Sequence, residues 1–187
     1  MEFSNPVKIL TELDSRLTKS TELTIYGRAA LAVGFSDSPL DWHVTMDVDA
    51  ILPVEHLSAI ESDGSFWKAL EQVNEELQDS GLYFTHLFED RQVILRPDWL
   101  RHRVDINRSE WPNLKLFRPS TADFILTKMM RVDPQDREDI EFLTHQTDYD
   151  LADLRDALAR AAVPDIPEIQ QAFEENRIWL ENMLGVE

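Results

Sequence analysis

Apolar positions in the first two thirds of the chain follow two different spacings. Short runs rich in β-branched and aromatic residues predict strands at 22–26, 43–52, 83–88 and 91–95, with shorter candidates at 103–106 and 114–117. Between them, apolar residues recur every three or four positions at 5–19 and 66–80, which predicts amphipathic helices. Shorter helices are expected at 28–33 and 54–60. The pattern indicates a mixed sheet with flanking helices.

From residue 121 onward only the helical spacing remains. Helices are expected from about residue 121, after Asp133-Pro134, over 151–162 and over 168–184. The sequence therefore predicts an α+β fold. Residues 1–118 are expected to form a core with a small mixed β-sheet, and residues 119–187 a helical C-terminal subdomain packed on it.

Composition narrows the class of protein. The 187 residues include no cysteine, which excludes disulfides, zinc–thiolate sites and thiol nucleophiles. No apolar run approaches the roughly 20 residues of a membrane helix, and the N-terminus lacks a signal-peptide pattern. A cytoplasmic protein with no membrane partner is expected.

Charge is unevenly distributed along the chain. The net charge of −18 argues against a broad nucleic-acid surface, which needs many basic side chains. Residues 91–131 nevertheless hold nine basic and four acidic residues. Either this stretch meets an anionic ligand, or its arginines neutralise the acidic helices around them.

Two carboxylates lie two positions apart on the predicted strand 43–52. Residues at this spacing point to the same face of a strand, so Asp47 and Asp49 project side by side. Carboxylates this close repel each other, and a hard cation such as Mg²⁺ relieves the repulsion. The alternative is a pair of strand-end carboxylates bonded to backbone amides or arginines. His43 falls on the same predicted face, where a structural role is expected for it.

A glycine separates the first predicted strand from the helix that follows. Strand, Gly27 and helix form a geometry in which a phosphate can approach the backbone and the free N–H groups of a helix start. An ordinary turn has the same sequence pattern.

These features occur in a definite order along the chain. Gly27-Arg28 comes first, followed by Thr45-x-Asp47-x-Asp49. Asp123-x-x-x-x-Lys128 and Asp136-Arg137-x-Asp139 come later on predicted helices. The order resembles the DNA polymerase-β-like nucleotidyltransferase superfamily, and more narrowly its AbiEii-type branch of toxin–antitoxin and phage-defence proteins.

The resemblance implies roles for residues at matching positions. Gly27 and Arg28 would border a nucleoside triphosphate, and Asp47 and Asp49 would hold Mg²⁺ or Mn²⁺. Further nucleotide-binding residues would be Thr45, Lys128 and Arg137, with Asp139 as a catalytic residue near the nucleotide or acceptor.

Some of these residues have alternative roles. Most relatives have glycine or serine where this chain has Arg28, which could contact phosphate or pair with Asp47 or Asp49. Asp105 is the candidate for a third carboxylate and could instead be a surface partner of Arg101 or Arg103. Lys128 could extend from the edge of a core face, and Asp139 could pair with a nearby base.

The resemblance implies an enzyme that moves a nucleoside monophosphate from an NTP to an acceptor hydroxyl. The acceptor would be a tRNA or other RNA end, a protein or a small molecule. The chain could act as the toxin of a toxin–antitoxin pair, with a cognate antitoxin as partner. The alternative is a catalytically weak nucleotide-binding module with a regulatory or partner-binding role.

Overall fold

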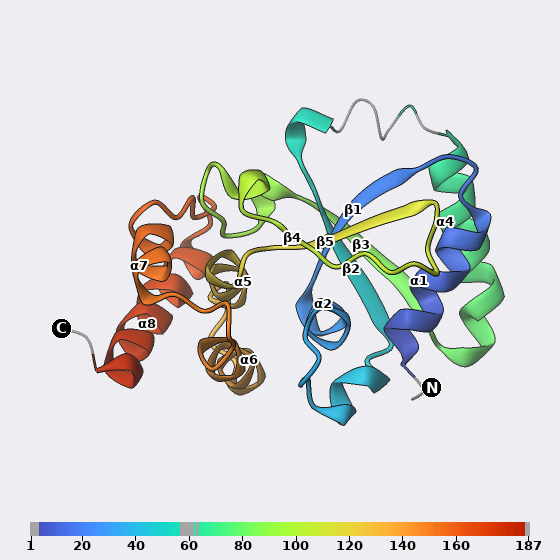
Figure 1. Ribbon diagram of the computed structural model, residues 1–187. Helices are drawn as coiled ribbons and strands as arrows, with labels where there is room; N and C mark the ends of the chain where they lie inside the picture. The colour runs from blue at the N-terminus through green and yellow to red at the C-terminus, as the bar shows by residue number, and fades with distance from the viewer. Residues whose placement is uncertain (1–3, 57–61, 63, 186–187) are drawn as a thin grey trace. The chain divides into compact units, whose positions relative to one another are not determined.

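The chain has an α+β fold, seen in a computed structural model that describes residues 4–56, 62 and 64–185 (Figure 1). The described residues form a five-stranded mixed sheet and seven α-helices, which confirms the predicted fold class and helical C-terminal part. They divide into two compact units. The first comprises Met1–Glu89 and Arg103–Arg118, and the second comprises Asp90–His102 and Pro119–Glu187. No described helix is long and apolar enough to cross a membrane.

The sheet belongs to the first unit and has the strand order β3-β2-β1-β5-β4. Its strands are β1 (Thr21–Tyr26), β2 (Asp47–Leu52), β3 (Tyr83–Glu89), β4 (Val104–Asp105) and β5 (Leu114–Arg118). The central strand β1 pairs antiparallel with β2 and parallel with β5. Strand β3 runs parallel to β2, and β4 runs antiparallel to β5.

Three helices pack on one face of this sheet: α1 (Asn5–Arg16), α2 (Gly27–Gly34) and α4 (Gly64–Leu77). Alternate strand residues such as Ile25, Val48 and Leu116 are fully buried beneath them. Burying each such side chain contributes about 1.5–3 kcal/mol. Because successive strand residues point to opposite faces, Asp47 and Asp49 project from the other face, which we call the open face.

The strand that carries the two carboxylates is shorter than predicted. It begins at Asp47, because residues Leu40–Val44 form a 3₁₀ turn that follows Pro39 and is anchored by the buried side chain of Trp42. His43 and Thr45 therefore lie outside the strand, and the expectation that His43 shares its face was wrong.

The strand predicted at residues 91–95 is absent. Asp90–Gln92 forms a 3₁₀ turn, and Leu95 makes only an isolated bridge to Ala162. Val93 and Ile94 are buried in the second unit, so their apolar character reflects core packing and not a sheet. Of the helix predicted at 54–60, Val54–His56 is a 3₁₀ turn and residues 57–60 lie outside the described part.

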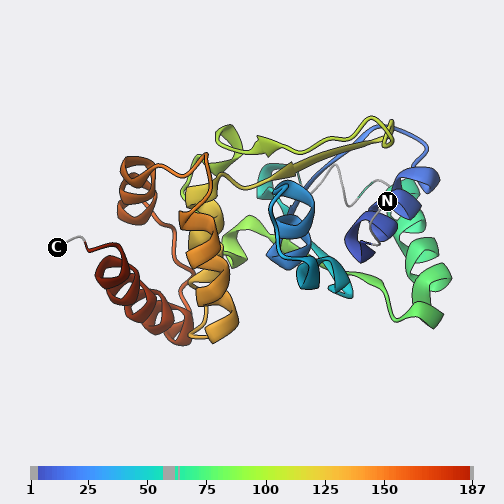
Figure 2. The same cartoon turned by 60° about the horizontal axis from the view of Figure 1, so that its bottom comes forward.

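The second unit contains α5 (Thr121–Lys128), α6 (Pro134–Thr144), α7 (Leu151–Ala159) and α8 (Pro167–Leu184), seen from another side in Figure 2. Polar residues cap three of these helices. The side chains of Ser120, Asp133 and Asp150 accept hydrogen bonds from backbone N–H groups of the first turns.

Residues 90–102 group with these helices, although they precede residue 118 in the chain. Arg96 explains the grouping. Its guanidinium is 1% exposed and donates to both carboxylate oxygens of Asp123 on α5 and of Asp153 on α7, over 2.7–3.1 Å. It also donates to Ser120 Oγ. One buried arginine thus joins the loop to two helices.

Candidate active site on the open face of the sheet

The strongest electrostatic anomaly on the open face is Asp49. Its Oδ1 atom is buried and has no hydrogen-bond partner among the described residues. Burial raises the pKa of Asp49 above its ordinary value, and the neighbouring charge of Asp47 raises it further, whereas His86 acts in the opposite direction. Asp47 accepts a hydrogen bond from Thr45 Oγ1 at 3.1 Å. The pair is an incompletely satisfied acidic site.

Gly27 lies directly against this pair. Tyr26 is in register with Asp49, so β1 ends and α2 begins beside the carboxylate. Gly27 has φ of +69°, a left-handed conformation that only glycine adopts readily. A Cβ at this position would lie 3.9 Å from Asp49 Oδ2. Carboxylates and a helix start, with its backbone N–H donors, therefore meet at one place.

Arg28, the next residue, is turned toward the 3₁₀ turn. Its guanidinium carbon lies 5.1 Å from the centre of the Trp42 ring, a cation–π geometry. This stacking differs from both roles considered for Arg28 from the sequence, contact with phosphate and pairing with Asp47 or Asp49.

His86 is a site residue that the sequence reasoning missed. Strands β2 and β3 shift register between Val48 and Ala50, because β3 has one extra residue opposite Asp49. Such a bulge re-aims a side chain. Here His86 Nδ1 comes to 3.4 Å from Asp49 Oδ1, a distance longer than that of an ordinary hydrogen bond. The apolar positions 84, 87 and 88 break the two-residue period and could have indicated the bulge.

Asp105, the candidate third carboxylate, does not join Asp47 and Asp49. It lies on the edge strand β4, separated from β2 by β5 and β1. Three strand spacings amount to roughly 14 Å. Its Oδ1 accepts a hydrogen bond from the backbone N–H of Asn107 at 2.8 Å, and the residue lines a cavity of about 530 Å³ together with His43 and Arg108. In that cavity wall, His43 Nε2 lies 3.0 Å from Ser38 Oγ.

Lys128 and Asp139 lie together in the second unit, as a buried ion pair. Lys128 Nζ is 2.6 Å from Asp139 Oδ2 and 3.1 Å from Asp136 Oδ1, and all three side chains are less than 10% exposed. Arg131 donates to the other oxygen of Asp136. This arrangement joins α5 to α6 and gives Lys128 a structural role in the second unit.

Arg137 is held within the same unit. Its Nε donates to Asn176 Oδ1 at 3.1 Å, and its guanidinium carbon lies 4.9 Å from the centre of the Trp179 ring on α8. These contacts fasten α6 to α8.

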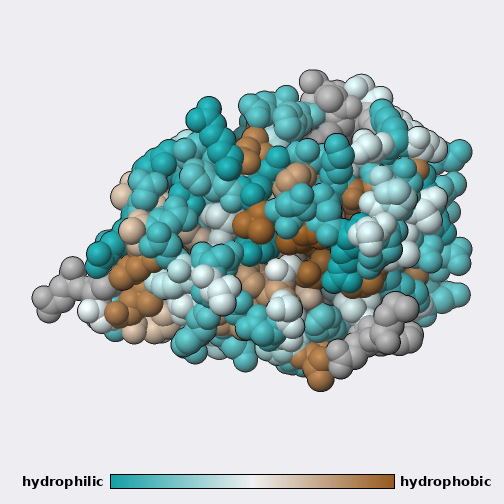
Figure 3. All heavy atoms as spheres, in the orientation of Figure 1, coloured by the Kyte–Doolittle hydropathy of each residue, from teal (hydrophilic) through white to brown (hydrophobic). Residues whose placement is uncertain are grey.

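Several bases of the region 91–131 are engaged inside their own units. Arg96, Arg118 and Lys128 are buried, and Arg103 lies over the Phe117 ring while donating to Thr24 and Glu22. Of these four residues, Arg96 and Lys128 pair with acids of α5, α6 and α7, in agreement with the neutralising interpretation. Hydrophilic residues cover most of the molecular face in Figure 3, in keeping with a net charge of −18.

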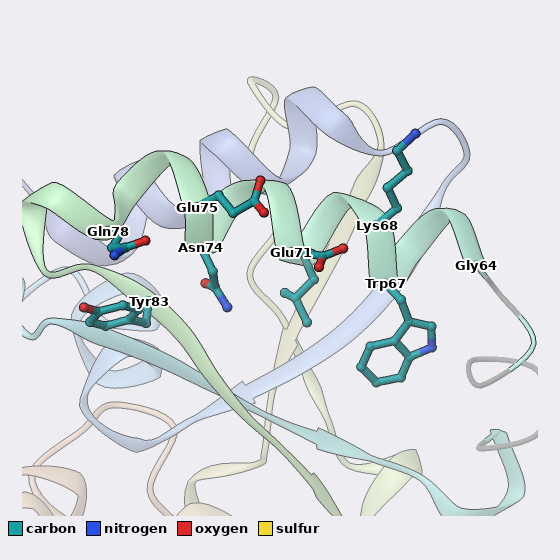
Figure 4. Close-up of a pocket in the computed structure, with 9 residues that line it drawn as sticks. Gly64, Trp67, Lys68, Glu71, Asn74, Glu75, Gln78 and Tyr83 are labelled. Atoms are coloured by element: carbon teal, nitrogen blue, oxygen red, sulfur yellow. The ribbon is translucent and has the colours of Figure 1, made fainter.

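A separate groove lies along α4 and the start of β3 (Figure 4). It has a volume of about 1060 Å³ and is lined by Trp67, Glu71, Asn74 and Tyr83 among others. Asn74 accepts from the N–H of Phe84 at 2.8 Å and donates to its carbonyl at 3.0 Å. It thereby takes the place of a neighbouring strand at this point of the sheet edge.

A metal at the candidate site would have two protein carboxylates as ligands. Nowhere in the described residues do three or more His, Asp or Glu side chains form a group that could hold a metal ion. Two carboxylates suit Mg²⁺, which keeps several waters and completes its shell with substrate phosphates. The Oδ1 atom of Asp49, which accepts no hydrogen bond from the described residues, fits such a ligand.

Comparison of the chain with protein-family models, curated proteins and solved structures gave no match. Functional inference therefore depends on the residues and their geometry.

Proposed function

We propose that the chain is a metal-dependent nucleotidyltransferase that acts on the open face of the sheet. The observation that carries this proposal is the junction of Asp49 and Gly27. A carboxylate whose buried Oδ1 accepts no hydrogen bond, and has only His86 Nδ1 near it at 3.4 Å, lies against a left-handed glycine at a helix start. The first feature suits a cation and the second suits a phosphate, so together they suit a metal-bound nucleotide.

Asp47 and Asp49 would hold Mg²⁺ or Mn²⁺, which would supply charge neutralisation on the transferring phosphoryl group. Gly27 leaves room for phosphate oxygens, and the first N–H groups of α2 donate to them. Thr45 keeps Asp47 oriented through its hydrogen bond. The acceptor hydroxyl attacks the α-phosphorus and gives its proton to water, the bond from the α-phosphorus to the bridging oxygen of the β-phosphate breaks, and pyrophosphate leaves.

The test is transfer of label from α-³²P-labelled NTPs to total cellular RNA or protein in the presence of Mg²⁺. We expect labelled product from the wild-type protein and none from Asp47→Asn or Asp49→Asn. Glu22→Gln is the matched control, because Glu22 is an acid of the same sheet that pairs with Arg103. Equal labelling by the wild type and the Asp47→Asn/Asp49→Asn double variant contradicts the assignment.

A second candidate, a nucleotide-binding module without turnover, is favoured by the residue opposite Asp49. The neighbouring strand supplies His86 there and not a carboxylate, and Asp105 is three strands away. A non-hydrolysable NTP titrated in a calorimeter separates the two functions. Mg²⁺-dependent binding without labelled product in any acceptor mixture supports the module.

The toxin role belongs to the same proposal, through the resemblance to the AbiEii-type branch. Expression in a bacterial host should arrest growth, and Asp49→Asn at equal protein level should relieve the arrest. Equal arrest by the variant argues against a toxic transferase activity.

A further inference from the structure

Three aromatic side chains form a continuous cluster on the open face beside Asp49. The ring centroids of Tyr26 and Phe88 are 5.7 Å apart at an interplanar angle of 89°. Those of Phe88 and His86 are 5.2 Å apart at 36°. Tyr26 and Phe88 are half-buried, and the side chain of His86 is 62% exposed. We call these three residues the aromatic platform.

The register of the sheet fixes where the platform lies. Tyr26 pairs with Asp49, and Phe88 pairs with Ile51, two residues further along β2. Because two residues along a strand span roughly 6.6 Å, the platform begins at the carboxylate and extends about one nucleotide step beyond it. The bulge that turns His86 toward Asp49 also brings its ring to Phe88.

Half-exposed rings on a sheet suit flat apolar ligands. Nucleobases stack on Phe, Tyr and His rings, and such stacking is tolerant of sequence because every base has a π-face. An arginine can extend a stacking surface, and Arg103 lies over Phe117 in the same sheet, with its guanidinium carbon 4.3 Å from the ring centroid.

We propose that the acceptor is a single-stranded nucleic acid whose bases stack on the aromatic platform. This inference rests on the proposed function, because it places the terminal hydroxyl of the strand at Asp47 and Asp49. It commits to one of the acceptor classes that nucleotidyl transfer allows. It also accommodates the net charge of −18, because stacking needs few cationic contacts.

The test is fluorescence anisotropy with a fluorescein-labelled ten-nucleotide oligoadenylate RNA and no NTP, with Mg²⁺ and again with EDTA. We expect Phe88→Leu and Tyr26→Leu each to weaken binding about tenfold, in line with the loss of one stacked base. Tyr26→Phe should keep the wild-type affinity, because it keeps the ring. Trp67→Leu, in the groove of Figure 4, is the aromatic control and should also bind normally.

A second ligand separates bases from phosphates. An abasic oligomer of the same length carries the same charge and should bind at least tenfold more weakly. A shallow dependence of affinity on salt is expected as well, because few phosphates meet cations. Equal affinity for the abasic oligomer, or unchanged RNA affinity of both leucine variants, overturns the proposal.

Two further outcomes overturn the assignment of the acceptor but leave the proposed transferase activity in place. In one, Phe88→Leu weakens binding of NTP and leaves RNA binding unchanged, so the platform holds the nucleotide base. In the other, only protein is labelled and RNA does not bind. Conversely, RNA binding that depends on the platform stands even if no label is transferred, so failure of the two proposals can be told apart.

Discussion

At the scale of single residues, the most informative side chain is Asp49. Its folded-state pKa is raised, first by burial and then by Asp47, so its ionised form opposes folding. Below the unfolded-state pKa the group is protonated in both states and has no effect. Its cost develops as the pH rises to the folded-state pKa and is complete above it.

Asp49→Asn should therefore stabilise the protein at neutral pH in EDTA, by about 1 kcal/mol. For a chain of this size that corresponds to a rise in Tm of about 2–4 °C. The gain should shrink as the pH falls through the folded-state pKa of Asp49. Urea unfolding of both proteins from pH 8 to pH 4 measures the trend. A variant less stable than the wild type at neutral pH would mean that the folded protein stabilises the ionised carboxylate of Asp49.

Gly27 permits a second prediction at this scale. Gly27→Ala should destabilise the protein by about 1–2 kcal/mol, because its φ of +69° is unfavourable for a residue with a Cβ. The added methyl makes only ordinary contact, at 3.9 Å from Asp49. Gly27→Asn should cost less, because Asn tolerates this conformation better. Thermal unfolding of the three proteins checks the order, and an alanine variant as stable as the wild type would exclude backbone strain.

At the scale of elements, period and capping made most of the helices and strands predictable. The run of β-branched and aromatic residues at 22–26 and the helix starts expected near residue 121 and after Asp133-Pro134 correspond to observed elements. The strand predicted at 91–95 failed because a buried apolar run looks alike in a sheet and in a helical core. The β3 bulge escaped notice because its one local signal, the broken two-residue period at positions 84, 87 and 88, does not show which residue of the neighbouring strand lies opposite.

The loop that contains Arg96 yields an element-scale prediction. Arg96→Met leaves the fully buried Asp123 without its main partner and should destabilise the protein by about 3–5 kcal/mol. That corresponds to a loss of about 10 °C in Tm. Arg96→Met combined with Asp123→Leu should recover much of the loss, because an apolar pair replaces a buried ion pair at little cost. Arg177→Met on α8, an arginine with partly exposed carboxylate partners, is the control. A double variant no better than the single one would contradict a simple charge pair.

At the scale of the whole molecule, short-range features were predictable from the sequence, whereas contacts between residues distant in sequence were not. Charge counts along the chain could not show that Arg96 is buried in ion pairs, because its partners Asp123 and Asp153 are distant in sequence. The carboxylate pair and Gly27 were recognisable, because strand period and a local turn are short-range properties. His86 reaches Asp49 only through sheet pairing, which no local pattern encodes.

The excess of 36 acidic over 18 basic residues should make the fold sensitive to ionic strength. Repulsion among exposed carboxylates disfavours the compact state, and salt screens it over a Debye length of about 10 Å at 0.1 M. We expect Tm to rise by a few degrees between low and moderate NaCl.

MgCl₂ at matched ionic strength should raise Tm further in the wild type, because a ligand specific to the folded state stabilises it by mass action. That increment should vanish in the Asp47→Asn/Asp49→Asn variant, whereas the NaCl effect persists. Scanning calorimetry of both proteins separates the two effects. A Mg²⁺ increment of equal size in the variant would place the ion elsewhere on the acidic surface, and a fall of Tm with NaCl would mean that ion pairs outweigh repulsion.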